Sequence, residues 1–359
     1  MIYHAHQLEK ERSQKMKIAK LYKFGDIRIE FISDPEPGPT DAVVKVKACG
    51  ICSGDVMPWY IEKKAPLVLG HEISGEIVKI GEKVKKNTPL KEGDRVAVHH
   101  HAPCMKCFYC LRGDYVQCDT WKSSKIYPGG ISEYILLPEV ILTNDTLKLP
   151  ENVSFEQGAM VEPVACVVKS LKRASIKKGD TILIIGLGVM GQIHIMLAKQ
   201  FGAVKVIGAD MVDFRLKKAL EAGADAVIDV SKENIYERMF SLTDGLMAQT
   251  VIVGPGNSDV IRESLKLVSR GGSLVIFTPT PPEQKLFLSV NDLYFKDINI
   301  VTSYSCGPDD TKRALDFIAN GLVDVNLLIT HRFSIYDTKK GYDITASAKD
   351  SLKCMIIFE

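Results

Sequence analysis

The sequence predicts an α/β protein of two domains, in which a β-rich domain accompanies a doubly wound parallel sheet. The chain has 359 residues, which is more than one ordinary hydrophobic core accommodates. Its first part shows short apolar runs broken by glycine and proline, a pattern typical of antiparallel strands. Its middle part alternates apolar strands with helical patterns, which indicates parallel βαβ units.

The β-rich part covers about residues 17–150 and follows a polar extension, residues 1–15, whose role the sequence leaves open. Pro-Gly and Gly-Gly pairs mark its turns. Its expected strands are VVKVKA at 43–48, GEIVKI at 75–80, DRVAVHH at 94–100 and SEYILLP at 132–138.

The alternating part begins near residue 163 with a helix that runs to residue 174. Its strands are continuously apolar, as expected when helices cover both faces of a sheet. The expected strands are 181–186, 205–210, 226–230, 250–254 and 273–277, and the expected helices are 189–201, 214–223, 233–240 and 258–269.

From about residue 305 the chain leaves the alternating pattern. A helix at 309–320 and a strand at 352–358 are predicted to return to the first domain. We therefore expect a first domain of residues 1–163, completed by 305–359, and a second domain of residues 164–304.

Composition excludes several classes of partner. Charged residues make up 25% of the chain and the net charge is +2, so no strong field favours nucleic acid or an anionic membrane. Apolar runs stay well short of the ~20 residues of a membrane helix, and the N-terminus lacks the apolar core of a secretory signal. We expect a cytoplasmic protein that acts on small molecules.

Nine cysteines in a cytoplasmic chain need an explanation, because disulfides are reduced there. Four thiolates close in sequence can surround one Zn²⁺ tetrahedrally, and such a closed shell leaves no position for substrate, which indicates a structural site. Buried free cysteines are one alternative. A zinc ribbon that binds nucleic acid is another, disfavoured by the absence of a basic face. The four cysteines are Cys104, Cys107, Cys110 and Cys118.

A second group of metal-binding side chains is spread more widely. Cys49 and Cys52 form a C-x-x-C pair, His71 and Glu72 follow, and Glu162 comes much later. One thiolate, one imidazole and one or two carboxylates suit Zn²⁺, and fewer than four protein ligands leave the open position that catalytic zinc needs. A structural histidine, a helix-start glutamate and a redox cysteine pair are the alternatives.

The end of the strand expected at 181–186 opens a dinucleotide fingerprint of the form G-x-G-x-x-G. Its glycines permit a tight turn and close approach to a pyrophosphate, which the following helix N-terminus also attracts. Asp210 ends the next strand, where a carboxylate binds ribose hydroxyls and repels a 2′-phosphate, so NAD is favoured over NADP. Arg215 nearby would bind ribose or accommodate a phosphate. A purely structural glycine turn is the alternative. The segment is Gly186-Leu187-Gly188-Val189-Met190-Gly191.

In order and spacing, these motifs resemble the zinc-containing medium-chain alcohol and polyol dehydrogenases, and the resemblance covers the chain from about residue 17. It implies a GroES-like catalytic domain beside a Rossmann domain, assembled as a homotetramer or homodimer. Glu162 and ITHRF resemble the sorbitol and threonine dehydrogenase branch, since liver-type enzymes have cysteine in place of Glu162. The motifs are GHExxGxIxxIG (70–81), EGDRV (92–96), the four cysteines, GGISEY (129–134), VEP (161–163), GLGVMG (186–191) and ITHRF (329–333).

The resemblance also implies roles for individual residues. It implies one structural zinc on the four clustered cysteines and one catalytic zinc on Cys52, His71 and Glu162. Glu72 is an alternate or second ligand in this branch, and Cys49 matches no ligand position. The positions that match cofactor contacts are Gly186, Gly188, Val189, Met190, Gly191, Asp210 and Arg215, with Lys353 where the family often has an arginine on the pyrophosphate.

Two departures from the family pattern matter. Gly54 stands where the family has the serine or threonine that relays the substrate proton, and Ser53 comes one position early. The proton must therefore leave by Ser53, by water or by another group, for which the histidine run 99–101 is one source. The arginine that sorbitol-type enzymes often carry near the position of Ser305 is also missing, which weakens a specific assignment to sorbitol.

The resemblance implies a zinc-dependent oxidoreductase that transfers a hydride between a secondary alcohol and NAD, with Zn²⁺ acting as Lewis acid on the hydroxyl. Two alternatives are a zinc-free medium-chain reductase and a non-catalytic NAD-binding protein. The substrate stays open among sugar alcohols, cyclitols, amino alcohols, short diols and phosphorylated polyols, as does the direction of the reaction. Trp59 and Trp121 are candidates for the pocket wall or for ordinary core positions.

Overall fold

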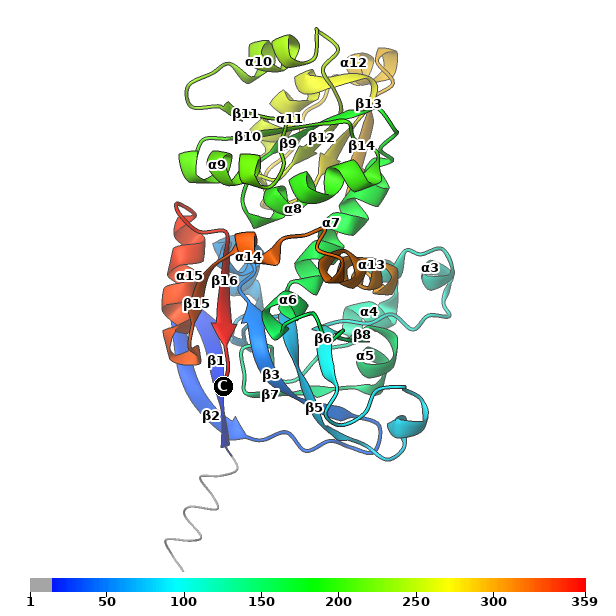
Figure 1. Ribbon diagram of the computed structural model, residues 1–359, viewed down its shortest axis with the longest axis vertical. Helices are drawn as coiled ribbons and strands as arrows, with labels where there is room; N and C mark the ends of the chain where they lie inside the picture. The colour runs from blue at the N-terminus through cyan, green and yellow to red at the C-terminus, as the bar shows by residue number, and fades with distance from the viewer. Residues whose placement is uncertain (1–14) are drawn as a thin grey trace, which may run out of the picture.

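Helix α7 (Val161–Ala174) joins the two parts of the chain in the computed structural model, which describes residues 15–359 (Figure 1). The predicted fold class is confirmed: a GroES-like part lies on one side of this helix and a Rossmann part on the other. The expected N-terminal extension lies outside the described residues except for Lys15, which begins the first strand.

The GroES-like part contains a seven-stranded sheet of order β15-β16-β3-β5-β6-β8, with β7 paired to β3. A separate three-stranded sheet has the order β2-β1-β4. Apolar side chains of the strands, such as Val44, Ile73 and Ile135, are almost fully buried and form the core. The strands that precede the Rossmann part are β1 (Lys15–Lys23), β2 (Asp26–Ser33), β3 (Ala42–Gly50), β4 (Leu67–Val68), β5 (Glu72–Ile80), β6 (Arg95–His99), β7 (Tyr134–Leu137) and β8 (Thr146–Lys148).

Short helices fill the connections of this part, for which the sequence analysis named no helix. Most of them span a single turn, too little for a periodic apolar pattern to be recognised. They are η1 (Ser53–Val56), α2 (Pro58–Ile61), η2 (Glu62–Lys64), η3 (Val84–Lys86), α3 (Phe108–Leu111), η4 (Tyr115–Gln117), α4 (Asp119–Ser123), α5 (Glu139–Asn144) and α6 (Phe155–Ala159).

The Rossmann part is a six-stranded parallel sheet of order β11-β10-β9-β12-β13-β14. Leu183, Ile207 and Val251 are fully buried in it, as the continuous apolar runs predicted. Its strands are β9 (Thr181–Ile185), β10 (Lys205–Asp210), β11 (Ala226–Asp229), β12 (Ala248–Val253), β13 (Val268–Ile276) and β14 (Asn299–Thr302).

The four expected helices of the Rossmann part are present, but α12 and the edge strand β14 were not predicted, and the helix expected at 189–201 ends at Ala198. The helix expected at 258–269 ends at Ser264, because Val268 already pairs with Ala248 of β12. The helices are α8 (Val189–Ala198), η5 (Lys199–Phe201), α9 (Asp213–Glu221), α10 (Ile235–Leu242), α11 (Ser258–Ser264), η6 (Leu265–Leu267) and α12 (Val290–Phe295).

The C-terminal segment returns to the first part, as Figure 1 shows by the position of its last strands beside β3. Helix α13 packs along α7, and β16 pairs antiparallel with β3, with Met355 opposite Gly50. Among residues 15–359, no helix has both the length and the apolar character needed to cross a bilayer. The elements are α13 (Pro308–Ala319), α14 (Val325–Leu328), β15 (Ile329–Phe333), η7 (Ile335–Asp337), α15 (Thr338–Ser347) and β16 (Lys353–Ile357).

Candidate active site and metal centres

The four clustered cysteines come together in a lobe at the edge of the GroES-like part. One sulfur from each lies within 4.8 Å of the other three, a spacing that suits tetrahedral zinc with Zn–S bonds of ~2.3 Å. Burial raises the pKa of Cys118, but backbone N–H groups of Cys104 and Trp121 outweigh it and lower that pKa to about 6. Cys118 therefore favours the thiolate form that a metal requires, whereas burial raises the pKa of Cys110 to about 12.

A second donor set forms where β3 ends and β5 begins. Donor atoms of Cys52, His71 and Glu72 all lie within 4.8 Å of one another. Nδ1 of His71 is 3.3 Å from the buried carboxylate of Asp55, which leaves Nε2 as the ligand atom, the arrangement common for metal-binding histidines. The structure thus brings three of the expected ligands together in an open set.

Glu72 is held by a buried ion pair with Lys353. The lysine amine lies 2.7 and 2.6 Å from the two carboxylate oxygens and 3.0 Å from the carbonyl of Ile51. Burial lowers the pKa of Lys353, but the negative charge of Glu72 outweighs it and raises that pKa above its ordinary value. The amine of Lys353, only 1% exposed, is directed to Glu72; its expected contact with a pyrophosphate stays a prediction.

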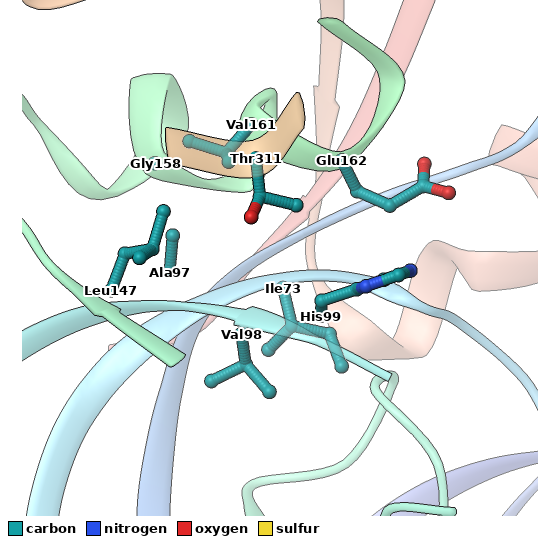
Figure 2. A pocket seen from close by; sticks show the side chains of 9 residues that line it. All are labelled: Ile73, Ala97, Val98, His99, Leu147, Gly158, Val161, Glu162 and Thr311. Atoms are coloured by element: carbon teal, nitrogen blue, oxygen red, sulfur yellow. The ribbon is translucent and has the colours of Figure 1, made fainter. Parts of the chain in front are cut away.

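Glu162 lies outside the set of Cys52, His71 and Glu72. It begins helix α7, and its Oε1 accepts a hydrogen bond from the thiol of Cys166 at 3.5 Å. Its carboxylate belongs to another group of donors within 4.8 Å, with His99 and Cys306. In Figure 2 the Glu162 carboxylate and the His99 ring extend toward the same side. As a ligand of the catalytic zinc, Glu162 stays a prediction.

The glycine loop between β9 and α8 has the geometry that its sequence predicts. Gly186 has a φ of +88°, and a Cβ on Gly191 would lie 2.2 Å from the carbonyl oxygen of Gly186, so neither position accommodates another residue without strain. Gly188 caps α8, and Val189 and Met190 form its first turn. The free N–H groups of this turn offer an anion site.

Asp210 and Arg215 stand beside the glycine loop. The Asp210 carboxylate accepts hydrogen bonds from the backbone N–H of Leu187 at 2.7 Å and of Met211 at 2.7 Å, and one guanidinium nitrogen of Arg215 lies 3.6 Å from it. Asp210 therefore fixes the loop and stands where β10 ends, close to the position expected for a ribose.

One pocket of about 610 Å³ connects the open donor set with the glycine loop. Cys52, His71 and Glu162 line it from the GroES-like part and α7, while Val189 and Met190 line it from the Rossmann part. Ser53 and Trp59 also line the pocket. Trp121 lies elsewhere, packed against His101 and the cysteine lobe.

Several residues that line the pocket could not be identified from the sequence. Met57, Phe277, Thr278 and Tyr304 line the pocket but carry no metal-binding or motif signature. Cys166 had a usable signal, because residues i and i+4 of a helix share a face and Glu162 is four residues earlier.

Comparisons with known proteins agree over most of the chain. Residues 38–151 match the family model described as alcohol dehydrogenase GroES-like domain, and residues 189–320 match the one described as zinc-binding dehydrogenase. The sorbitol dehydrogenase of Bombyx mori is 33% identical over 343 residues, which cover 92% of this chain and 95% of that protein.

Two solved structures show which cofactors occur on this fold. A zinc-binding dehydrogenase from Sinorhizobium meliloti 1021, bound to NADP, has a TM-score of 0.84 and 27% identity and covers 96% of this chain and 99% of its own. The alcohol dehydrogenase rspB from Escherichia coli CFT073, complexed with NADH, has a TM-score of 0.84 and 26% identity and covers 96% and 100%.

We expect Lys353→Met to lower the free energy of unfolding by about 3–5 kcal/mol, because it leaves the Glu72 carboxylate buried without its counter-charge. Urea unfolding followed by circular dichroism measures the change. Lys79→Met is the matched control, since it removes only the exposed pair with Glu36 and should cost no more than ~1 kcal/mol. Equal losses in the two variants would contradict the role given to the buried pair.

Proposed function

This chain belongs to the zinc-containing medium-chain alcohol and polyol dehydrogenases, and on that premise we propose that it transfers a hydride between a secondary alcohol and NAD. The observation that carries the proposal is the shared pocket, whose wall contains Cys52 and His71 on one side and the glycine loop on the other. A substrate hydroxyl at the metal and a nicotinamide anchored by that loop would meet in one cavity.

We propose that Cys52, His71 and Glu162 hold the catalytic zinc, with Glu72 as the alternate ligand. The donor chemistry fits, since a thiolate, an imidazole and a carboxylate suit Zn²⁺ and leave an open position. When bound, the zinc supplies Lewis-acid stabilisation of the alkoxide. Asp55 orients His71, and Lys353 neutralises Glu72. The four cysteines of the lobe would hold a second, structural zinc.

We propose NAD as the preferred cofactor, held by Gly186, Gly188, Val189, Met190 and Gly191. Asp210 supports this preference, because its buried carboxylate stands at the end of β10 and would repel a 2′-phosphate. Arg215 is already paired with Asp210, so it offers less positive charge to a phosphate. Lys353, whose amine is paired with Glu72 but which also lines the pocket, is the last of the proposed cofactor contacts.

Ser53 is the hydroxyl that we propose for the first proton transfer. It is exposed and lines the pocket one residue after Cys52. A Cβ at Gly54 would stand 3.5 Å from the Cys52 sulfur, which is where the family hydroxyl would start. His100 lies beside His71, with ring centroids 4.8 Å apart, and water is the remaining route.

We propose a secondary alcohol of the polyol, cyclitol or amino-alcohol type as substrate.

The surface also supports self-association into a homodimer or homotetramer. Four large apolar side chains on and beside α12, next to the edge strand β14, are all more than 70% exposed: Phe287, Val290, Tyr294 and Phe295. A cytoplasmic location follows from the need of the cysteine lobe for reduced thiols. The net charge of +2 favours neither a nucleic-acid nor an anionic membrane partner.

A panel of sugar alcohols, cyclitols, amino alcohols and diols, assayed by NADH formation, tests the activity. We expect at least one substrate to be oxidised by the wild type and none by Cys52→Ser, because the variant loses the thiolate of the catalytic set. Circular dichroism and the zinc content should show an intact fold with one zinc fewer. Full activity in the variant would remove the catalytic-zinc assignment and favour a zinc-free reductase. A wild type inactive on every substrate would favour a non-catalytic protein.

Cys107→Ser should act on stability first. A structural zinc contributes directly to folding, so we expect a lower Tm and the loss of one zinc per chain, measured by thermal unfolding and elemental analysis. Cys49→Ser, which changes a buried thiol that donates only to the carbonyl of Gly50, is the control and should retain the full zinc content. An unchanged Tm in Cys107→Ser would oppose the structural role of the lobe.

Asp210→Ala should shift cofactor preference toward NADP. The substitution removes the carboxylate that repels the 2′-phosphate and frees Arg215 to bind it, so kcat/KM should fall with NAD and rise with NADP. The measurement is the ratio of the two kcat/KM values, which we expect to change by at least tenfold, or about 1.4 kcal/mol. Asp213→Ala, at the exposed start of α9, is the control. Unchanged kcat/KM values for both cofactors would contradict the role proposed for Asp210.

A further inference from the structure

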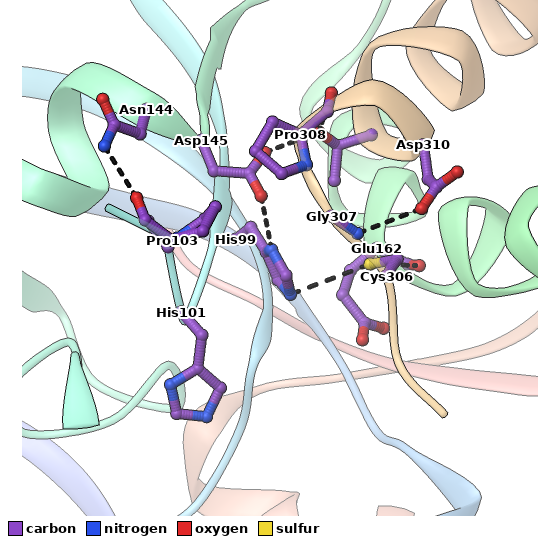
Figure 3. Close-up of polar contacts among 12 residues, drawn as sticks. His99, His101, Pro103, Asn144, Asp145, Glu162, Cys306, Gly307, Pro308 and Asp310 are labelled. Atoms are coloured by element: carbon purple, nitrogen blue, oxygen red, sulfur yellow. Dashed lines mark hydrogen bonds and ion pairs between the residues drawn. The ribbon is translucent and has the colours of Figure 1, made fainter. Parts of the chain in front are cut away.

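A third group of soft metal donors lies behind the pocket wall. Nε2 of His99 is 3.7 Å from the sulfur of Cys306, and both lie within 4.8 Å of the Glu162 carboxylate. The thiol of Cys166 donates to Glu162 Oε1 at 3.5 Å. Figure 3 shows His99 and Cys306 side by side above Glu162. One sulfur, one imidazole and one carboxylate thus converge, and a second sulfur lies beside the carboxylate.

The imidazole of His99 is already oriented as a metal-binding histidine usually is. Its Nδ1 is 2.6 Å from Oδ2 of Asp145, and Oδ1 of Asp145 accepts a hydrogen bond from the hydroxyl of Thr311 at 2.5 Å. His99, Asp145 and Thr311 are at most 2% exposed. A carboxylate on Nδ1 fixes the tautomer and directs the lone pair of Nε2 toward Cys306, as in carboxylate–histidine–zinc triads.

The group has room beside it and a route from solvent. His99 and Glu162 line a small cavity of about 10 Å³, on the order of one water molecule, which Figure 2 shows. Glu162 and Cys166 line the large pocket as well. Among the described residues, Glu162 is the only one that lines both spaces, so an ion entering the pocket would reach the group along α7.

The chemistry of the group favours a soft divalent ion. Thiolate and imidazole donors select zinc and its relatives over magnesium or calcium. The sulfur of Cys306 is fully buried and lies 3.7 Å from Nε2 of His99, so the two donors can reach one ion.

We propose that His99, Cys306 and Glu162 hold a third zinc-class ion, with Cys166 as the adjacent sulfur, distinct from the cysteine lobe and from the set of Cys52 and His71. The site goes beyond the proposed function, and Glu162 would serve both ions with one carboxylate oxygen to each. His99 and Cys306 do not line the large pocket. The ion would therefore stabilise the wall of the pocket and would not contact the substrate.

The zinc content of the purified full-length protein tests the proposal. After dialysis against Zn²⁺ and removal of excess ion, we expect three zinc ions per wild-type chain and two in Cys166→Ala/Cys306→Ala. Cys354→Ala removes a fully buried cysteine that belongs to none of the three donor sets, and this control should keep three. Two ions in the wild type, or three in the double variant, would overturn the proposal and indicate a hydrogen-bonded cluster only.

A second experiment uses a wild-type crystal grown with Zn²⁺, so its result does not depend on whether a variant folds. Anomalous diffraction at the zinc edge should give a peak with a Zn–S distance of ~2.3 Å to Cys306, besides the peaks at the other two sets. Its absence would refute the third site and leave the proposed dehydrogenase activity untouched. That activity depends instead on the loss of turnover in Cys52→Ser, so the two failures are distinguishable.

Discussion

The register of three strands, β5, β3 and β16, determines the chemistry of this protein. Gly50 lies opposite Glu72 across one pairing and opposite Met355 across the other, and the buried ion pair between Glu72 and Lys353 ties the outer strands together. A Cβ at Gly50 would lie 1.9 Å from the Glu72 carboxylate, so only glycine leaves room for the pair. A slip of one residue would turn these side chains to the opposite face of the sheet.

This arrangement explains how the open donor set contains a buried carboxylate, since Glu72 is only 1% exposed. A carboxylate without a partner in such a place would be protonated or would destabilise the fold. Lys353 offsets part of that cost, although burial still raises the pKa of Glu72 above its ordinary value, and Asp55 plays the corresponding role for His71. These neighbours therefore orient the ligand atoms of the set for a divalent ion.

Glu162 connects the two kinds of metal chemistry that we propose. It begins the helix that joins the two parts of the chain, lines the large pocket and contacts Cys166 one turn later. Any change at Cys166 or Cys306 would alter the environment of this carboxylate, so the wall behind the pocket and the catalytic set are coupled through one side chain. Asp210 also has two roles, on the cofactor side of the pocket. It accepts a hydrogen bond from the glycine loop, and it stands near the expected position of the ribose.

The sequence by itself determined the features whose partners are close along the chain. The alternation of strands and helices, the cysteine spacing from 104 to 118 and the glycine loop at 186–191 depend on local periodicity and turn geometry, and they could be read directly. Only the tertiary structure decided which partner Lys353 and Glu162 take. Lys353 meets a residue 281 positions away and Cys306 meets His99 207 positions away; such contacts arise from sheet register and helix packing, for which no local pattern of residues carries a signal.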